Sequence, residues 1–105
     1  TPLMFITERQ RLICHRLQQV CKRQAFGGDC YNYMAIASGW GTMPLVILES
    51  DLKYYDFCAI IPIIEGTGGC ITDWQGKPLK QDSTEVLATS NRVLLEQALS
   101  VIANL

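Results

Sequence analysis

The chain has 105 residues, of which 49% are hydrophobic and 18% charged, with a mean hydropathy of +0.13. This length fits one small domain, and the apolar content is sufficient for a core, which excludes intrinsic disorder. A membrane span is not expected, because the longest strongly apolar run, Phe57 to Ile64, contains Pro62 and is far shorter than the ~18 residues needed. Basic residues gather near the start of the chain on an expected helix, where a solvated face explains them more simply than a nucleic-acid surface.

The cysteines and the single histidine do not form a zinc-binding pattern. They are Cys14, Cys21, Cys30, Cys58 and Cys70, together with His15. The number of cysteines is odd and no C-x-x-C spacing occurs, so neither a disulfide framework nor paired zinc ligands are indicated. We interpret the cysteines as reduced, small apolar side chains of a cytoplasmic protein. The charged first twenty residues lack the apolar stretch of a secretory signal peptide.

An amphipathic helix is expected over residues 8–22. Thr7 and Gln10 match a T-x-x-Q capping box, in which two side chains satisfy free amide groups at a helix start. Its buried face is expected to consist of Ile13, Leu17, Val20 and Cys21, which recur at helical spacing. The segment 24–26 after this helix is compatible with a short strand.

A glycine pair precedes a second expected helix over 30–38. Gly27 and Gly28 are followed by Asp29, which is a good N-cap residue. Two glycines let the backbone approach a ligand, and the free amides of the helix favour an anion there. A plain turn is the simpler alternative. Asp29 would repel a phosphate, and it suits a hydroxyl, an amine or an imidazole better.

An apolar run over 43–48 predicts a strand that ends at Glu49. After a polar loop, a helix is expected over 55–66, with a kink at Pro62, which removes one backbone hydrogen bond. Asp56 lies in the first turn of this helix, where the helix dipole stabilises an acid by about 0.3–1 kcal/mol. The alternative role for Asp56 is that of a ligand for a hard cation. Glu49 would face the same crevice, since ligands gather beyond the carboxyl ends of strands in α/β sheets.

The remaining elements alternate between strands and helices. They are a glycine-rich turn at 66–69, a strand at 70–74, a turn at 75–78 and a strand at 85–89. The glycine-rich turn follows a helix and precedes a strand, which is the reverse of a phosphate-binding P-loop. Ser90 or Asn91 caps the last helix, whose buried stripe comprises Leu94, Leu95, Ala98, Leu99 and Ile102. Alternation of this kind predicts a layered α/β domain with helices covering a sheet.

Several motifs occur in the same order as in a known enzyme family. They are Asp56-Phe57-Cys58-Ala59, then Pro62-Ile63-Ile64-Glu65-Gly66-Thr67-Gly68-Gly69, then Ile71-Thr72-Asp73-Trp74 with a Gly76-x-Pro78-Leu79 turn, then Val86-Leu87-Ala88-Thr89-Ser90-Asn91. This series, over residues 8–105, resembles the inositol monophosphatase family. The run Gly27-Gly28-Asp29-Cys30-Tyr31-x-Tyr33 is most similar to its histidinol-phosphate phosphatase-like branch.

The resemblance implies a fold, a reaction and a set of residue roles. The fold is a layered α/β/α domain with a mixed sheet covered by helices. Asp56 stands at the position of the family aspartate that binds catalytic magnesium, and Glu49 at that of the glutamate that contacts substrate hydroxyl groups. Gly27, Gly28 and Asp29 stand where the family contacts the organic part of the substrate. The implied reaction is hydrolysis of a small phosphorylated alcohol by a metal-activated water.

Two metal-binding motifs of the family are absent from this sequence. It contains neither a Glu-Glu pair nor a D-P-x-D-G-T motif. We therefore expect residues 1–105 to form a single α/β domain that corresponds to the C-terminal half of a larger phosphatase, without a complete catalytic site and inactive in isolation. The alternative is a non-catalytic remnant or oligomerisation module of the same fold. A homo-oligomer is expected, because absence of the N-terminal half would uncover an apolar face.

Overall fold

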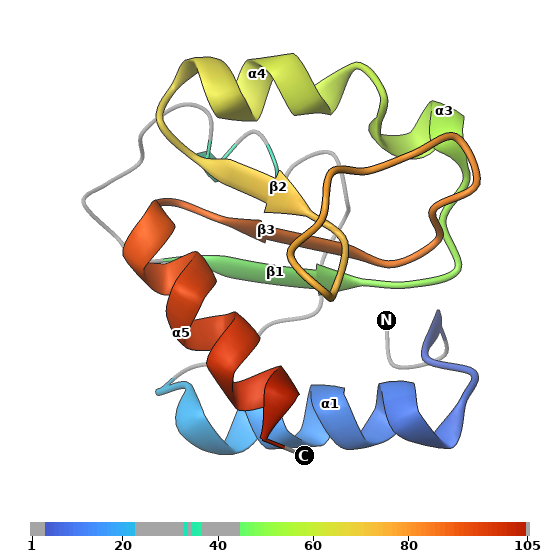
Figure 1. The fold of residues 1–105 in the computed structure, drawn as a ribbon, viewed down its shortest axis with the longest axis vertical. Helices are drawn as coiled ribbons and strands as arrows, with labels where there is room; N and C mark the ends of the chain where they lie inside the picture. The colour runs from blue at the N-terminus through green and yellow to red at the C-terminus, as the bar shows by residue number, and fades with distance from the viewer. Residues whose placement is uncertain (1–3, 23–32, 34, 37–44, 105) are drawn as a thin grey trace.

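The computed structural model describes residues 4–22, 33, 35–36 and 45–104 (Figure 1). Its elements are α1 (Glu8–Val20), β1 (Val46–Glu49), α3 (Tyr54–Phe57), α4 (Ile60–Gly66), β2 (Cys70–Thr72), β3 (Val86–Thr89) and α5 (Arg92–Ala103). Among the described helices, none has both the length and the apolar composition needed to cross a membrane.

The three described strands form one sheet in the order β1-β3-β2. The last strand in sequence, β3, is therefore the central one, and it is antiparallel to both neighbours, with Glu49 opposite Val86 and Thr72 opposite Leu87. Because β1 and β2 both run against β3, their carboxyl ends lie at the same edge of the sheet. The expected α/β class is confirmed. All pairs of adjacent strands in the described part are antiparallel, so the parallel pairs of a mixed sheet do not occur there.

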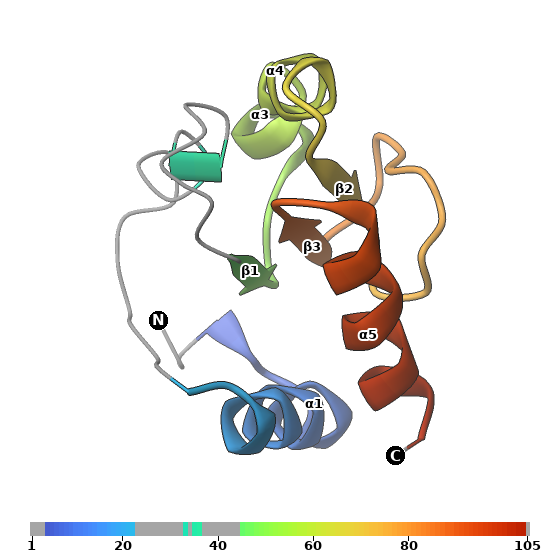
Figure 2. The same cartoon turned by 90° about the vertical axis from the view of Figure 1, so that its left-hand side faces the viewer.

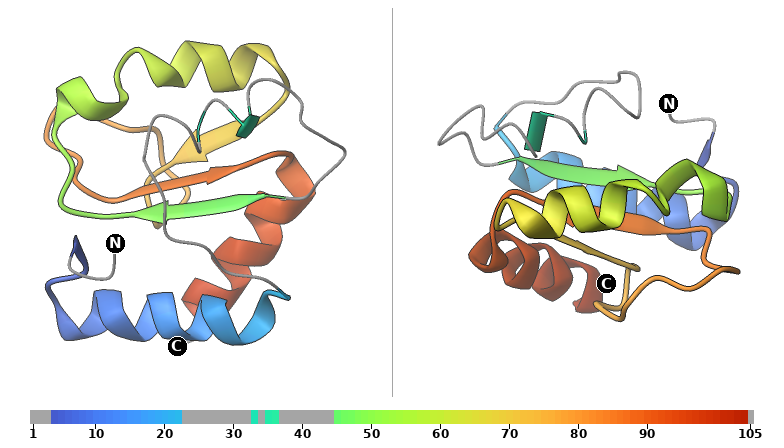
Figure 3. Two further views of the ribbon diagram at one scale, coloured as in Figure 1. Left: turned by 180° about the vertical axis from the view of Figure 1, so that it is seen from behind. Right: turned by 90° about the horizontal axis from the view of Figure 1, so that it is seen from above.

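Helices cover both faces of this sheet, as expected for a layered domain. In Figure 2 the sheet separates α3 and α4 above from α1 and α5 below, and Figure 3 gives the same layers from behind and from above. The core beneath α3 and α4 contains Tyr33, Ile36, Leu52, Phe57, Ile64, Ile71, Val86 and Ala88. The core on the α1 and α5 side contains Phe5, Ile13, Leu17, Trp74, Leu87, Leu95, Ala98 and Ile102.

Helix α1 begins as predicted and ends two residues earlier. The capping box is present, with Gln10 N donating to Thr7 Oγ1 over 3.0 Å and Gln10 Oε1 accepting from Thr7 N over 3.1 Å. The expected burial of Val20 and Cys21 is wrong, since Val20 is 51% exposed and Cys21 is exposed. Val20 is the last residue of α1, and Cys21, with extended backbone angles, lies beyond the helix, so the buried face ends at Leu17.

The expected continuous helix over 55–66 is wrong, because two short helices, α3 and α4, take its place. The chain leaves the helix at Cys58 and Ala59, and Pro62 lies in the first turn of α4. A proline within a helix clashes with the carbonyl four residues earlier, which here belongs to Cys58. In a first turn the missing amide of proline costs no intrahelical bond. The break therefore falls one turn before the proline.

The glycine-rich turn after α4 is a Schellman motif. Gly69 N donates to Ile64 O over 3.0 Å and Gly68 N donates to Glu65 O over 3.2 Å, while Gly68 has a φ of +88°. These bonds satisfy carbonyls at the helix end, and glycine adopts the required left-handed conformation without a steric penalty. The expected turn from helix to strand is confirmed.

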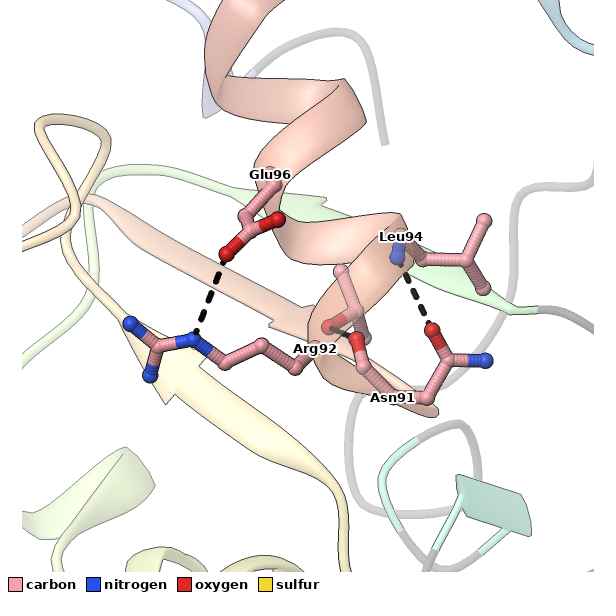
Figure 4. A network of polar contacts seen from close by, with 5 residues as sticks. Asn91, Arg92, Leu94 and Glu96 are labelled. Atoms are coloured by element: carbon pink, nitrogen blue, oxygen red, sulfur yellow. Dashed lines mark hydrogen bonds and ion pairs between the residues drawn. The ribbon is translucent and has the colours of Figure 1, made fainter.

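Helix α5 is capped by Asn91, which decides between the two predicted cap residues. Asn91 Oδ1 accepts from Leu94 N over 2.8 Å (Figure 4). The other candidate, Ser90, instead bonds to the residue before β1, with Leu45 N donating to Ser90 Oγ over 3.0 Å. Of the predicted stripe, Leu95, Ala98 and Ile102 are buried, and Leu94 and Leu99 are half-buried.

Candidate functional site

Glu49 lies at the carboxyl end of β1, on the side of the sheet that α3 and α4 cover. Along β1, Leu48 packs into the core on the α1 and α5 side, and Ile47 packs into the core beneath α3 and α4. Side chains alternate between the two faces of a strand, so Glu49 projects to the same face as Ile47. Its side chain is only 5% exposed. A carboxylate is therefore buried at the edge of the sheet where the predicted site lies.

Asp56 lies in α3, in the helical layer above the same face. Its side chain is exposed, and Oδ2 accepts a hydrogen bond of 2.8 Å from Lys53 N, the backbone amide at the start of the helix. A carboxylate in this position satisfies a free amide and interacts favourably with the helix dipole. Asp56 thus has the structural role of an acid in the first turn of a helix. This role uses one of its two carboxylate oxygens.

The loop that joins Glu49 to Asp56 is attached to the segment before β3. Asp51 has a φ of +57°, the left-handed conformation, which aspartate tolerates better than most residues. The next residue, Leu52, is buried and its N donates to Thr84 O over 3.1 Å. The loop before α3 is thereby tied to the segment that precedes β3. This hydrogen bond constrains the loop between β1 and α3.

The described residues do not complete a metal site. No group of three or more His, Cys, Asp or Glu side chains that could hold a metal ion occurs among them. Magnesium requires about six oxygen ligands in near-octahedral geometry, of which proteins usually supply one or two carboxylates. Asp56 fits the role of one such ligand, since its carboxylate is exposed. The described part of the chain does not supply a complete donor set, and we derive no catalytic step through a metal.

Three predicted substrate-binding residues, Gly27, Gly28 and Asp29, lie outside the described residues. The same applies to the short strand considered at 24–26 and to most of the helix expected over 30–38. Within that helix Tyr33 and Ile36 are described, and both are helical and buried in the core beneath α3 and α4. The structure therefore places two of the predicted site residues, Glu49 and Asp56, on the same side of the sheet.

Sequence reasoning did not single out the polar hollow that follows β2. It has a volume of about 200 Å³ and is lined by Asp73, Gln75, Asp82, Ser83, Thr84 and Glu85. Two of its three acids have structural partners: Asp73 Oδ1 accepts from the amides of Gln75 and Lys77, both over 2.8 Å, and Glu85 accepts from Gln10. In the sequence, the many acidic and hydroxyl side chains between β2 and β3 could have indicated this hollow.

Comparisons with known proteins identify the family. The family model described as the inositol monophosphatase family matches residues 5–105. The chain is 41% identical over 95 residues to the bifunctional phosphatase IMPL2, chloroplastic, of Arabidopsis thaliana, covering 90% of this chain and 26% of that protein. It is 34% identical over 77 residues to a histidinol-phosphatase of Chlorobaculum parvum, covering 73% of this chain and 28% of that protein.

Solved structures agree with this assignment. An inositol monophosphatase from Zymomonas mobilis superposes with a TM-score of 0.87 at 36% identity, over 98% of this chain and 40% of that chain. A staphylococcal IMPase-II superposes with a TM-score of 0.75 at 17% identity, over 95% of this chain and 38% of that chain, which shows the shared fold. The chain thus spans about a quarter of the curated relatives and two fifths of the solved structures. The resemblance seen in the motifs is confirmed, and the chain belongs to the inositol monophosphatase family.

Proposed function

We propose that this chain is the C-terminal domain of a magnesium-dependent phosphatase that hydrolyses a small phosphate monoester of the inositol phosphate or histidinol phosphate type. The observation that carries the proposal is the placement of Glu49 and Asp56 on one side of the sheet, at the ends of a loop that is held in place. The names of the related phosphatases support the substrate class.

In this proposal each residue has a separate role. Asp56 contributes one oxygen to a magnesium site whose other ligands lie outside the described residues. Magnesium, when bound, would activate a water and neutralise charge on the phosphate. Glu49 accepts hydrogen bonds from substrate hydroxyl groups, and Gly27, Gly28 and Asp29 contact the organic part of the substrate. We expect the isolated chain to be inactive, because its described residues do not supply a complete donor set.

The proposed setting is a reducing, cytoplasmic one. The described cysteines, Cys14, Cys21, Cys58 and Cys70, are free thiols, which fits such a compartment. The partner that we propose is a small phosphorylated alcohol rather than a nucleic acid or a membrane, with a homo-oligomer as the assembled form.

The test compares the isolated chain with a chimera in which it replaces the matched region of the Z. mobilis enzyme. We expect magnesium-dependent release of phosphate from the chimera and none from the isolated chain. Asp56→Asn keeps an oxygen that can accept from Lys53 N but removes the charge. Loss of a metal ligand removes several kcal/mol of transition-state stabilisation, so kcat/KM should fall by ~100-fold or more.

The matched control is Asp82→Asn, which removes an exposed carboxylate from the loop before β3 and should leave turnover unchanged. Robust turnover by the isolated chain would refute the claim that its site is incomplete. Equal activity of the Asp56→Asn and Asp82→Asn chimeras would refute the role of Asp56.

A second candidate function is a non-catalytic or oligomerisation module of the same fold. It is favoured by the hydrogen bond between Asp56 Oδ2 and Lys53 N, because this bond alone is a sufficient structural reason for the aspartate. On this alternative, Asp56→Asn changes stability slightly and the chimera shows no magnesium-dependent activity.

A further inference from the structure

A groove with a volume of about 530 Å³ lies between α1, α5 and the turn after β2. Helices α1 and α5 pack against each other on one side of the sheet (Figure 2). The groove is lined mainly by apolar side chains, of which Ile13, Trp74 and Ile102 are buried. Sites for small molecules typically have volumes of about 300–1,000 Å³ and a largely apolar lining. The groove therefore has the size and the lining of a small-molecule site.

The turn that forms one wall of the groove is held in place from two directions. Within the turn, Asp73 Oδ1 accepts from Gln75 N and Lys77 N, both over 2.8 Å, and Asp73 N donates to Lys77 O over 2.9 Å. Against α5, Gly76 approaches so closely that a Cβ there would lie 2.9 Å from Leu99 Cδ1. The wall is thus fixed without a ligand, as expected of a preformed site.

The polar side chains that line the groove are those of Arg9 and Gln75, and no carboxylate occurs among its described lining residues. Arg9 is exposed, and in the part of the chain that the structure describes it forms neither an ion pair nor a hydrogen bond. The other described arginines of α1 and α5 all have partners: Arg11, Arg16 and Arg92. A guanidinium without a partner beside an apolar surface is suited to an anion.

The two helix ends at the groove give such an anion one orientation. Arg9 lies in the first turn of α1, where the helix dipole also favours negative charge, and Glu8 of the same turn does not line the groove. The opposite wall includes Ala103, the last residue of α5, where the free carbonyl groups of a helix end repel an anion. The charge of a ligand therefore belongs at Arg9 and its apolar part towards α5.

We propose that this groove binds a small carboxylate with an aromatic or branched apolar body. The carboxylate pairs with the guanidinium of Arg9, which can donate two parallel hydrogen bonds to it. The apolar body covers Trp74 and Leu99. The groove lies on the opposite side of the sheet from Glu49 and Asp56, so the proposal does not depend on the proposed function.

Titration of the chain with 2-naphthoate, followed by amide chemical shifts, tests the proposal, and the neutral isostere 2-naphthamide is the matched probe. We expect saturable binding of 2-naphthoate that perturbs the amides of Arg9, Gln75 and Ala103. Binding of 2-naphthamide should be about tenfold weaker, because a charge-assisted hydrogen bond is lost. Added salt should weaken only the binding of 2-naphthoate. Equal binding of the two probes, no saturable binding of 2-naphthoate, or shifts confined to residues away from the groove would overturn the proposal.

A pair of arginine substitutions isolates the role of the charge. Arg9→Gln keeps a polar side chain and should weaken binding of 2-naphthoate about tenfold while leaving that of 2-naphthamide unchanged. Arg16→Gln makes the same change on the same helix, at a residue that does not line the groove, and should leave both unchanged. Equal affinities of the two variants for 2-naphthoate would overturn the proposal.

A second pair of substitutions tests the groove itself. Ala103→Phe places a ring at the wall formed by α5 and should abolish binding of both probes. Val93→Phe adds the same ring at a residue of α5 that is 63% exposed and outside the groove, and should leave binding unchanged. Undiminished binding by Ala103→Phe would overturn the proposal. A dimeric mass by light scattering, with groove amides that shift on dilution without a probe, would overturn it in favour of a second copy of the chain.

Discussion

The side chain of Gln10 joins the start of α1 to the residue before β3: its Nε2 donates a hydrogen bond of 2.8 Å to Oε2 of Glu85. The same side chain accepts from Ile6 N over 2.9 Å and from Thr7 N over 3.1 Å. One buried amide therefore completes the helix cap and attaches α1 to the segment that leads into the central strand.

Substitution of Gln10 tests this connection. Gln10→Ala leaves two backbone amides and a half-buried carboxylate without this partner, which should lower the free energy of unfolding by about 1–3 kcal/mol. Gln10→Glu keeps the acceptor oxygen but places a second carboxylate beside Glu85. Its destabilisation should be large at pH 7 and smaller in acid, because protonation of the introduced carboxyl removes the repulsion.

Urea denaturation at pH 7 and pH 4 measures both effects. The control, Gln97→Glu, adds the same charge at an exposed position on α5 and should show little change at either pH. A Gln10→Glu variant that is no less stable than Gln97→Glu at pH 7 would argue against the contact with Glu85.

The glycines after and within α4 should respond oppositely to alanine. A Cβ at Gly69 would lie 2.8 Å from Ile64 Cγ2, 3.0 Å from Ile36 Cγ2 and 3.1 Å from Thr89 O, whereas nothing lies within 4 Å of a Cβ at Gly66. Gly69→Ala should therefore cost about 1–3 kcal/mol through overpacking. Gly66→Ala should be neutral or stabilise by about 0.4–1 kcal/mol. Thermal unfolding of both variants, which differ from wild type by the same methyl group, checks the contrast.

The start of α5 should depend on its cap and not on its ion pair. Asn91→Ala removes the bond from Leu94 N and should cost about 0.5–2 kcal/mol. Arg92 and Glu96 are exposed and 3.7 Å apart (Figure 4), so Arg92→Ala should cost no more than about 0.5 kcal/mol. Unfolding at low and at high salt separates the two, because only the ion pair is weakened by screening. Equal losses for the two variants would contradict this assignment.

Two cysteines of the same helix region should differ in reactivity. Burial raises the pKa of the Cys14 thiol, whereas Cys21 is exposed after the end of α1. Because the thiolate is the reactive form, iodoacetamide should modify Cys21 faster than Cys14 at pH 8, as followed by mass spectrometry. Unfolding should abolish the difference, and faster reaction at Cys14 in the folded chain would contradict it.

The raised pKa of Cys14 also has a consequence for stability. The unfolded chain loses this proton first as the pH rises, so the stabilising contribution is present below the unfolded pKa of about 8.5 and is lost as the pH rises through the folded pKa. Cys14→Ala should show a shallower decrease in stability at alkaline pH than wild type. A parallel decrease in the two proteins would exclude this contribution.

The sequence alone determined the features that depend on neighbouring residues. The capping box of Thr7 and Gln10 and the turn after α4 rest on hydrogen bonds between residues at most five positions apart. The cap of α5 was narrowed by sequence to Ser90 or Asn91, and the structure selected Asn91. Residue type is sufficient to predict such bonds. The family was also visible in the sequence, because its motifs are runs of consecutive residues.

Tertiary structure decided what depends on residues distant in sequence. The insertion of β3 between β1 and β2 requires Glu49 to pair with Val86, which lies far along the chain. The expected helix over 55–66 is divided at Cys58 because of backbone sterics. The sequence predicted a kink at Pro62, which is one turn too late. Long-range contacts of this kind must offset the entropy that is lost when the intervening loops close. No local sequence pattern encodes that cost.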